Sequence, residues 1–405
     1  MTSSKLKFCA ILIAGLLLAD NCWCKSYEMS ELLDIAEKNS VVKAAEFSAL
    51  AQKRFANQQK YWENPVFSAN QDVNQKSYSI SQAIPFYGKL DSKYKVEEAQ
   101  YKILETRKNN LVLSVKAETF VLLYQYHALQ RKIELAQKRL DRLSLVDIYL
   151  SKIILSSPTQ GAQGQITKDR IKLVNRDLVR YKNQLYQTWN RANIYLNLDE
   201  QPQINISWLE SKNYRGREFF VNEAISNNLI LREQKFLIEK SKSELSFANL
   251  EKMPDVNITA TRDDPSASAG GNRANGIGLS LSLPLINRNQ EKILGAESKI
   301  KAQEMEFEFQ KNFLIRSISN DINEFETALK IARNFPTAEV PQILNRLNKA
   351  NNNFKKGILD FITYIELDSQ EYQMIDTIID TQVDVAASYA ALMIKVGNFT
   401  LPKND

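Results

Sequence analysis

Histidine and cysteine, which often perform acid–base, nucleophilic or metal chemistry, are scarce in this chain, and its many carboxylates are spread along the predicted helix faces. His127 is the only histidine, and all three cysteines lie within the first 24 residues. A serine or cysteine nucleophile needs a neighbouring base, most often histidine, so hydrolase-type groupings have almost no material. The methionines after Met1 are scattered along the chain, as packing residues are. We therefore expect no enzyme activity, no metal site and no cofactor.

The remaining polar features are equally unspecific. Gly270 and Gly271 lie in a polar turn that lacks the Gly-x-x-x-x-Gly-Lys-Ser/Thr pattern of a phosphate-binding loop. Glu366 and Asp368 would form an acidic ring if several copies surrounded a channel, although such carboxylates are more often simply solvated. The 53 basic and 47 acidic residues are interspersed, so no nucleic-acid partner is expected.

The first 24 residues have the pattern of a secretory signal peptide. Two lysines precede a short apolar core at 8–19, and small residues follow. The core is too short to span a bilayer comfortably, and we expect cleavage between Cys24 and Lys25. The alternative is a lipoprotein acylated at Cys22 or Cys24. After cleavage the chain would have no disulfide.

Two short segments alternate apolar residues with small or polar ones. Each ends at a proline, Pro85 in the first and Pro284 in the second. A strand with this alternation has one face for lipid and one for water. The positions predicted to face lipid are Tyr78, Ile80, Ile84, Ile277, Leu279, Leu281 and Leu283.

The two halves of the chain match segment by segment, which predicts two structural repeats, 25–210 and 211–405. Each repeat begins with a helical stretch, continues through a β-hairpin and a helix of more than sixty residues, and ends with a return helix. The expected segments are helices at 27–63, 89–155, 165–198, 218–253, 290–355 and 361–396 and hairpins at 65–85 and 254–284. A polar turn at 262–273 separates the strands of the second hairpin.

The long helices carry apolar residues in the alternating spacing of a coiled coil. One seam includes Leu122, Tyr126 and Leu143, and the other runs from Ile315 to Ala332. Breaks are expected at 156–164, at the prolines 336 and 341, and at 351–357. The predicted fold is mostly α, with long antiparallel coiled-coil helices and four β-strands per chain in a small membrane part.

Four strands cannot close a barrel, and an open sheet edge is not tolerated in lipid. Several copies must therefore complete one barrel if these strands lie in a membrane. Two copies would give eight strands and three would give twelve, and the pattern alone does not choose between them.

Three segments resemble the TolC family of outer-membrane efflux channels. Ser81-Gln-Ala-Ile-Pro-Phe-Tyr-Gly-Lys89 and Leu283-Pro-Leu-Ile-Asn-Arg-Asn-Gln290 are similar to the segments that follow the two hairpins in that family. Phe354-Lys-Lys-Gly-Ile-Leu-Asp-Phe361 is similar to the turn at its periplasmic tip. The resemblance covers about 27–397 and is greatest to the branch that serves heavy-metal pumps of the resistance-nodulation-division class. The chain departs from the family pattern at Ala83, Glu291 and Phe354, and 156–164 matches poorly.

The resemblance implies a homotrimer that closes a 12-stranded barrel in the outer membrane of a Gram-negative bacterium, above a helical tunnel through the periplasm. Its partners would be a periplasmic adaptor (membrane fusion protein) and an inner-membrane pump. The trimer itself would be a passive duct that exports small solutes, such as heavy-metal cations. The same fold could instead serve drug efflux or type I protein secretion. A periplasmic coiled-coil adaptor is the alternative of another class, but the chain shows no lipoyl-like or small β-barrel domain.

The resemblance also places two predicted turns at the tip. Lys355, Lys356, Gly357 and Asp360 would dock the adaptor or form a gate, and Gly161 and Gly164 would do so on the first repeat. The simpler interpretation of Gly357 is a glycine that ends a helix between solvated charges.

Overall fold

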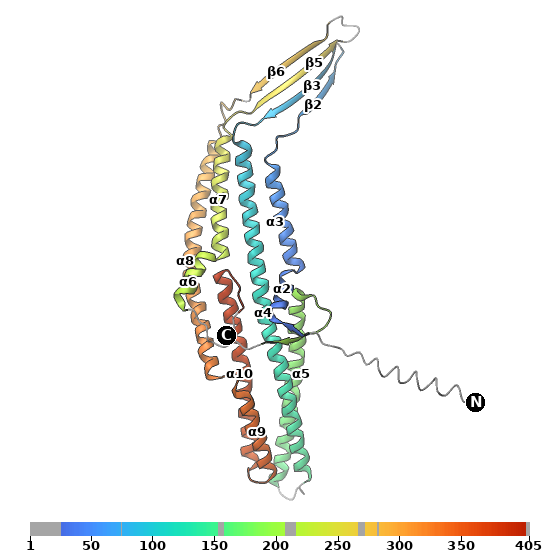
Figure 1. The fold of residues 1–405 in the computed structure, drawn as a ribbon, viewed down its shortest axis with the longest axis vertical. Helices are drawn as coiled ribbons and strands as arrows, with labels where there is room; N and C mark the ends of the chain where they lie inside the picture. The colour runs from blue at the N-terminus through green and yellow to red at the C-terminus, as the bar shows by residue number, and fades with distance from the viewer. Residues whose placement is uncertain are drawn as a thin grey trace, which may run out of the picture.

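The protein is elongated, with a small β-sheet at one end and long helices running away from it (Figure 1). The computed structural model describes residues 26–73, 75–152, 158–206, 216–265, 272–281 and 283–401. The predicted signal peptide with Cys22 and Cys24, and the Gly270–Gly271 turn, lie outside the described residues. The prediction of a mostly helical chain with a small sheet is confirmed.

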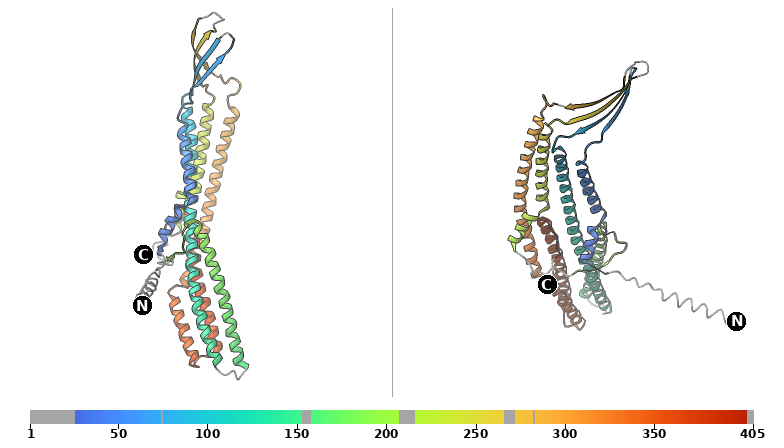
Figure 2. Two further views of the ribbon diagram at one scale, coloured as in Figure 1. Left: turned by 90° about the vertical axis from the view of Figure 1, so that its right-hand side faces the viewer. Right: turned by 45° about the horizontal axis from the view of Figure 1, so that its top comes forward.

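The helices form two groups along the long axis. Next to the sheet, four helices lie side by side in the order α3 (Ser40–Gln58), α4 (Lys89–Lys152), α7 (Leu229–Leu250) and α8 (Gln290–Asn334). At the far end, α4 continues beside α5 (Pro158–Leu196), α9 (Glu339–Lys355) and α10 (Phe361–Val396), as Figure 2 shows. The predicted return helix at 361–396 is confirmed at both ends.

The sheet contains four antiparallel strands in the order β2 (Val66–Gln71), β3 (Gln75–Ile84), β5 (Val256–Pro265) and β6 (Ala274–Leu281). Both predicted hairpins are present, but two details were wrong. The turn predicted at 262–273 starts later, because β5 continues to Pro265 opposite the first residues of β3. Leu283 lies beyond the end of β6, next to Pro284, which cannot donate to a strand ladder.

The described residues contain six strands rather than the predicted four. β1 (Ser26–Glu28) pairs in parallel with β4 (Gln203–Asn205), well away from the main sheet. Three-residue strands are too short for an alternating pattern to appear, so hydrophobic periodicity could not find them.

The two helical stretches before the hairpins are each divided in two. The predicted helix 27–63 is α2 (Met29–Glu37) followed by α3, and 218–253 is α6 (Arg217–Asn227) followed by α7. The side chain of Asn39 accepts hydrogen bonds from the amides of Val41 and Val42 at 2.6 and 3.3 Å. Asn228 accepts one from the amide of Leu231 at 3.0 Å. Each asparagine therefore caps a new helix and ends the previous one.

The predicted break at 156–164 is shorter than expected. α5 begins at Pro158, so Gly161 and Gly164 are helical. Proline is favourable at the first helical position, where no intrahelical partner for its missing N–H is needed. The interruption predicted at Pro336 is confirmed, since α8 ends at Asn334 and α9 begins at Glu339.

The predicted coiled-coil seams form the core. Leu122, Tyr126 and Leu143 of α4 are buried, and on α8 Leu314 is buried where the sequence suggested its neighbour Ile315. α10 buries apolar residues on two faces, one against α4 and one against α8. This central position explains its mostly apolar composition.

Gly397 ends α10 under a tight constraint that can be tested. Its φ is +84°, and an added Cβ would overlap the backbone carbonyl of Asn227. Gly397→Ala should lower the free energy of unfolding by about 2 kcal/mol or more, since left-handed strain and the clash act together. Gly295→Ala, in the interior of α8 with open space around it, should raise it by ~0.5–1 kcal/mol. Urea denaturation followed by circular dichroism measures both, and equal effects of the two substitutions would contradict the assignment.

Candidate functional site

The sheet has one strongly apolar face. The register places Ile80 beside Phe67 of β2 and beside Ala260, which in turn pairs with Ile277. The predicted residues Tyr78, Ile84, Leu279 and Leu281 lie on this same face, together with Val256 and Ile258, which the sequence analysis missed. Ile277 is 88% exposed and Leu279 is 73% exposed. Since strand residues two apart share a face, the register alone defines this apolar surface.

The opposite face carries small and polar residues. It includes Ser68, Ser77, Ser79, Ser81, Thr259, Thr261, Gly276, Gly278 and Ser280, with Val66 as an apolar exception. The hydroxyls of Ser81 and Thr259 lie 3.1 Å apart. At Gly276 a Cβ would approach the Thr261 hydroxyl to 2.9 Å. This face therefore presents a close-packed polar surface.

The sheet is open on both sides. Within the described residues, β2 pairs only with β3 and β6 only with β5. The outer strands therefore present backbone N–H and C=O groups that need partners wherever water is absent.

The tip opposite the sheet is a defined helix–helix turn. Gly357 has φ +73°, its amide donates to the Phe354 carbonyl at 2.9 Å, and the Ile358 amide donates to the Asn353 carbonyl at 2.9 Å. These two bonds are the Schellman arrangement that ends helices at a left-handed residue. The structure thus places Gly357 where the simpler interpretation predicted, and Lys355 and Lys356 are exposed beside it.

Asp360 begins the next helix. Its carboxylate accepts a hydrogen bond from the Thr363 hydroxyl at 2.5 Å and from the Thr363 amide at 3.0 Å. These bonds, the hydroxyl first, lower the pKa of Asp360 below its usual range. Asp360 is therefore an N-cap of α10.

Two exposed apolar residues at the tip were missed by the sequence analysis. Ile358 is 72% exposed and Ile362 is 74% exposed, on either side of Asp360. The sequence contains a pattern that could have identified them, because an isoleucine in a turn of charged residues has no core to fill. Gly161 and Gly164 lie in the first two turns of α5 with open space around their α-carbons, at the same end of the molecule as the α9–α10 turn (Figure 1).

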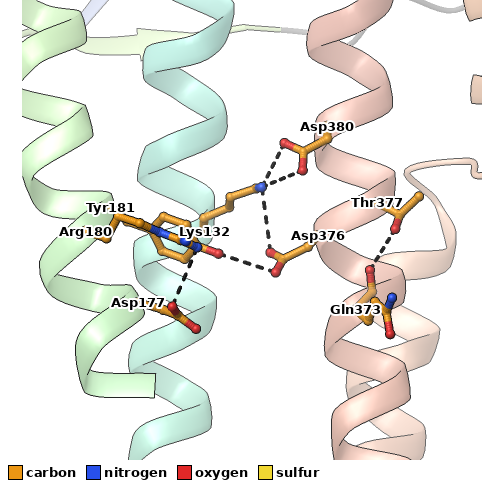
Figure 3. Close-up of polar contacts among 8 residues, drawn as sticks. All are labelled: Lys132, Asp177, Arg180, Tyr181, Gln373, Asp376, Thr377 and Asp380. Atoms are coloured by element: carbon orange, nitrogen blue, oxygen red, sulfur yellow. Dashed lines mark hydrogen bonds and ion pairs between the residues drawn. The ribbon is translucent and has the colours of Figure 1, made fainter. Parts of the chain in front are cut away.

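A polar seam joins α4, α5 and α10 above the tip (Figure 3). Lys132 of α4 donates to both carboxylate oxygens of Asp380 at 2.8 Å and lies 4.0 Å from Asp376. The Tyr181 hydroxyl of α5 lies 3.4 Å from the Asp376 carboxylate. These residues line an open groove of about 490 Å³. Burial raises the pKa of Asp376, and Asp380 adds to the rise.

The seam continues toward the tip through a buried charge. Asp368 is only 2% exposed and accepts a hydrogen bond from Arg139 of α4 at 2.8 Å, while Arg142 donates to the Tyr372 hydroxyl at 2.5 Å. Asp368 therefore does not form the exposed acidic ring that the sequence suggested, whereas Glu366 is exposed. The α4–α10 pair holds Asp368 by a charge-assisted bond in a poorly hydrated place.

The described residues offer no grouping for metal chemistry. Among them, no three His, Cys, Asp or Glu side chains lie close enough together to hold a metal ion. Burial lowers the pKa of His127, and the charge of Arg131 adds to the effect.

No helix among the described residues is both long and apolar enough to cross a membrane.

Comparisons with known proteins identify the fold. No protein-family model and no curated protein matches the sequence.

Solved structures do match over nearly the whole chain. A membrane protein from Pseudomonas aeruginosa shares 15% identity at a TM-score of 0.75, covering 91% of this chain and 90% of that one. The open state of the Neisseria gonorrhoeae MtrE outer membrane channel shares 14% at 0.74, covering 91% and 89%. CusC, studied for transmembrane channel formation, shares 14% at 0.72, covering 92% of both chains. The chain therefore has the fold of the outer-membrane channels.

Asp376 and Asp360 should give pH dependences of opposite sign. The pKa of Asp376 is raised in the folded chain, so its contribution favours folding below the unfolded pKa and is lost as pH rises through the folded value. The pKa of Asp360 is lowered, so its contribution is present above the unfolded pKa and is lost as pH falls through the folded value. Asp376→Asn should reduce the loss of stability from acid to neutral pH, and Asp360→Asn should reduce the loss on acidification. Thermal melts between pH ~3 and ~7 check this, and changes of the same sign would contradict it.

Proposed function

We propose that this chain is a member of the TolC family and forms the passive outer-membrane exit duct of a tripartite efflux pump. The observation that carries the proposal is the sheet with one apolar and one polar face, open at both edges, at the end of a long helical body. A duct needs a lipid-facing outside and a water-facing inside, and this sheet supplies both. The likeness of the fold to outer-membrane channels supports the same conclusion.

The open edges favour assembly into a closed ring, and the resemblance to the TolC family implies three copies. Three four-stranded sheets give a 12-stranded barrel, in which β2 of one copy pairs with β6 of the next. The two outer helices of the layer, α3 and α8, could make a contact between the same neighbouring copies, since each exposes large apolar side chains. On α3 these are Phe47 and Phe55, and on α8 they are Met305, Phe309 and Phe313. The Ser- and Thr-rich face would then line the lumen, as a passive pore wall does.

The tip is the proposed docking surface for a periplasmic adaptor, which links the duct to an inner-membrane resistance-nodulation-division pump. Lys355, Lys356 and the apolar pair Ile358 and Ile362 are exposed there. Gly357 and Asp360 fix the turn that presents them, and Gly161 and Gly164 lie in the first two turns of α5 at the same end. An apolar pair within a charged rim has the composition of a protein-binding surface.

The remaining proposals concern export and cargo. Residues 1–24 would be a secretory signal peptide that directs export of the chain from the cytoplasm, with acylation at Cys22 or Cys24 as the alternative. Residues 25–210 and 211–405 would be the two repeats of the family. The local motifs favour heavy-metal cations as cargo, and drugs or a type I secretion substrate are the alternatives.

Assembly can be tested at the edge of the helix layer. Phe309→Asp should abolish or strongly reduce the heat-sensitive trimer band and the ion conductance in planar bilayers, because a charge would be placed in the proposed contact between copies. Lys301→Asp, at an exposed position of the same helix, is the control. Normal trimers of Phe309→Asp, or a wild-type protein that extracts without detergent and does not conduct, would overturn the proposal.

Cargo can be tested by growth of a deletion strain and its complemented parent. The panel contains zinc, cadmium, cobalt, copper and silver beside detergents, dyes and antibiotics. Sensitivity confined to metals and restored by the gene is the expected result. Sensitivity to amphiphiles instead would replace the cargo and keep the duct.

A further inference from the structure

A buried polar cluster joins α4 to α10 above the tip. Tyr364, Asp368 and Tyr372 lie four residues apart on one face of α10, and Arg139 and Arg142 lie three apart on the facing side of α4. The Cζ atoms of the two arginines lie 4.6 and 5.3 Å from the centre of the Tyr372 ring. Three charged groups and two hydroxyls therefore share one small region between the two helices.

The direct bonds of this cluster leave three polar atoms without a hydrogen-bond partner in the part of the chain that the structure describes. They are Asp368 Oδ1, the Tyr364 hydroxyl and Arg142 Nε. Asp368 is 2% exposed, Tyr364 is 0% exposed and Arg142 is 8% exposed, so bulk solvent does not satisfy them. Folded proteins rarely leave buried polar atoms unpaired, and each such atom needs an explanation.

The three atoms belong to side chains that face one another. The Nη2 atom of Arg142 lies 3.6 Å from Asp368 Oδ1, which is too long for a direct hydrogen bond. Burial raises the pKa of Tyr364, and the charge of Asp368 adds to the rise while that of Arg142 opposes it. The Tyr364 hydroxyl is therefore within electrostatic reach of both charges. Polar contacts of this length are commonly bridged by a water molecule.

The chemistry of the three atoms selects the occupant. Arg142 Nε–H can only donate, ionised Asp368 Oδ1 can only accept, and the Tyr364 hydroxyl can do either. A chloride ion would be repelled by the carboxylate, and a metal cation would be repelled by the guanidinium. A water molecule accepts from the first atom, donates to the second and bonds to the third. These are the three hydrogen bonds typical of a buried water.

We propose that a single water molecule binds between α4 and α10 at this point and completes the cluster. Apolar side chains surround the site, since Tyr364 belongs to the same apolar cluster as Leu143 and stacks on Phe354 with ring centres 4.9 Å apart. The water holds α10 on α4 in addition to the direct bond from Arg139 to Asp368. The site lies within one chain, so it does not require the proposed trimer.

The sign of one stability change tests for this water. If the Tyr364 hydroxyl had no partner, Tyr364→Phe would remove an unpaired buried group and would raise the melting temperature of the full-length protein in detergent. If the hydroxyl binds the water, the same substitution breaks a hydrogen bond. We then expect the melting temperature to fall by about 1–3 °C. A rise, or no change, would overturn the proposal.

Two other tyrosines provide matched controls. Tyr372→Phe removes a hydroxyl that accepts a direct bond from Arg142 at 2.5 Å. It should lower the melting temperature whether or not the water is bound, which shows that the assay detects the loss of one bond. Tyr186→Phe, at a residue of α5 that is 60% exposed, should leave the melting temperature unchanged. Equal falls for Tyr186→Phe and Tyr364→Phe would contradict the proposal.

A crystal structure of the full-length protein, at a resolution that shows ordered water and with bromide in place of chloride, locates the occupant directly. We expect one density peak within hydrogen-bond distance of Asp368 Oδ1, Arg142 Nε and the Tyr364 hydroxyl, without an anomalous signal from bromide. A bromide signal there would overturn the water in favour of an anion. Direct pairing among the three atoms, or a side chain from a neighbouring copy in that position, would overturn the site itself.

Discussion

The unpaired backbone of the outer strands is the constraint on which the proposed assembly depends. Each N–H or C=O without a partner costs several kcal/mol in lipid, on the order of the penalty for any buried polar group. The helix layer has the same order as the sheet, because α3 leads into β2, β3 into α4, α7 into β5 and β6 into α8. A ring that joins β2 to β6 therefore also brings α3 beside α8. The apolar stripes on those two helices are what such a ring would bury.

α4 is the element that unites the two ends of the molecule. It packs against α3 and α7 near the sheet and against α5 and α10 toward the tip. Its apolar residues contribute to each of the three apolar clusters of the core, but apolar contacts alone tolerate small shifts along a helix. The bond from Arg139 to Asp368 does not tolerate such shifts, since Asp368 is buried and an unpaired buried charge costs about 3–5 kcal/mol. The polar seam thus fixes the register of α10 on α4.

Much of this architecture could be predicted from hydrophobic periodicity. The alternation around Ile80 and Leu279 and the long seam of α4 are repeated signals, so each residue supports its neighbours. Features that depend on one side chain or on one distant partner were missed or misplaced. Asn39 and Asn228 end helices inside apolar stretches because one side chain satisfies the free amides of a new helix. The β1–β4 pair depends on two segments far apart in the sequence. The burial of Asp368 depends on its ion pair with Arg139 of another helix, and no local sequence pattern indicates that partner.

The tip shows how a motif can have a structural cause before a functional one. Gly357 is required by its left-handed backbone, and Asp360 by the amides that it caps. Their presence in a family-like segment is therefore explained by the turn itself, and neither needs a partner protein. The fold gives no such structural reason for four other side chains at the tip, since all are exposed and none fills the core. They are Lys355, Lys356, Ile358 and Ile362. The proposed docking of an adaptor at the tip is accordingly assigned to these four side chains, and the glycine and the aspartate hold the turn that presents them.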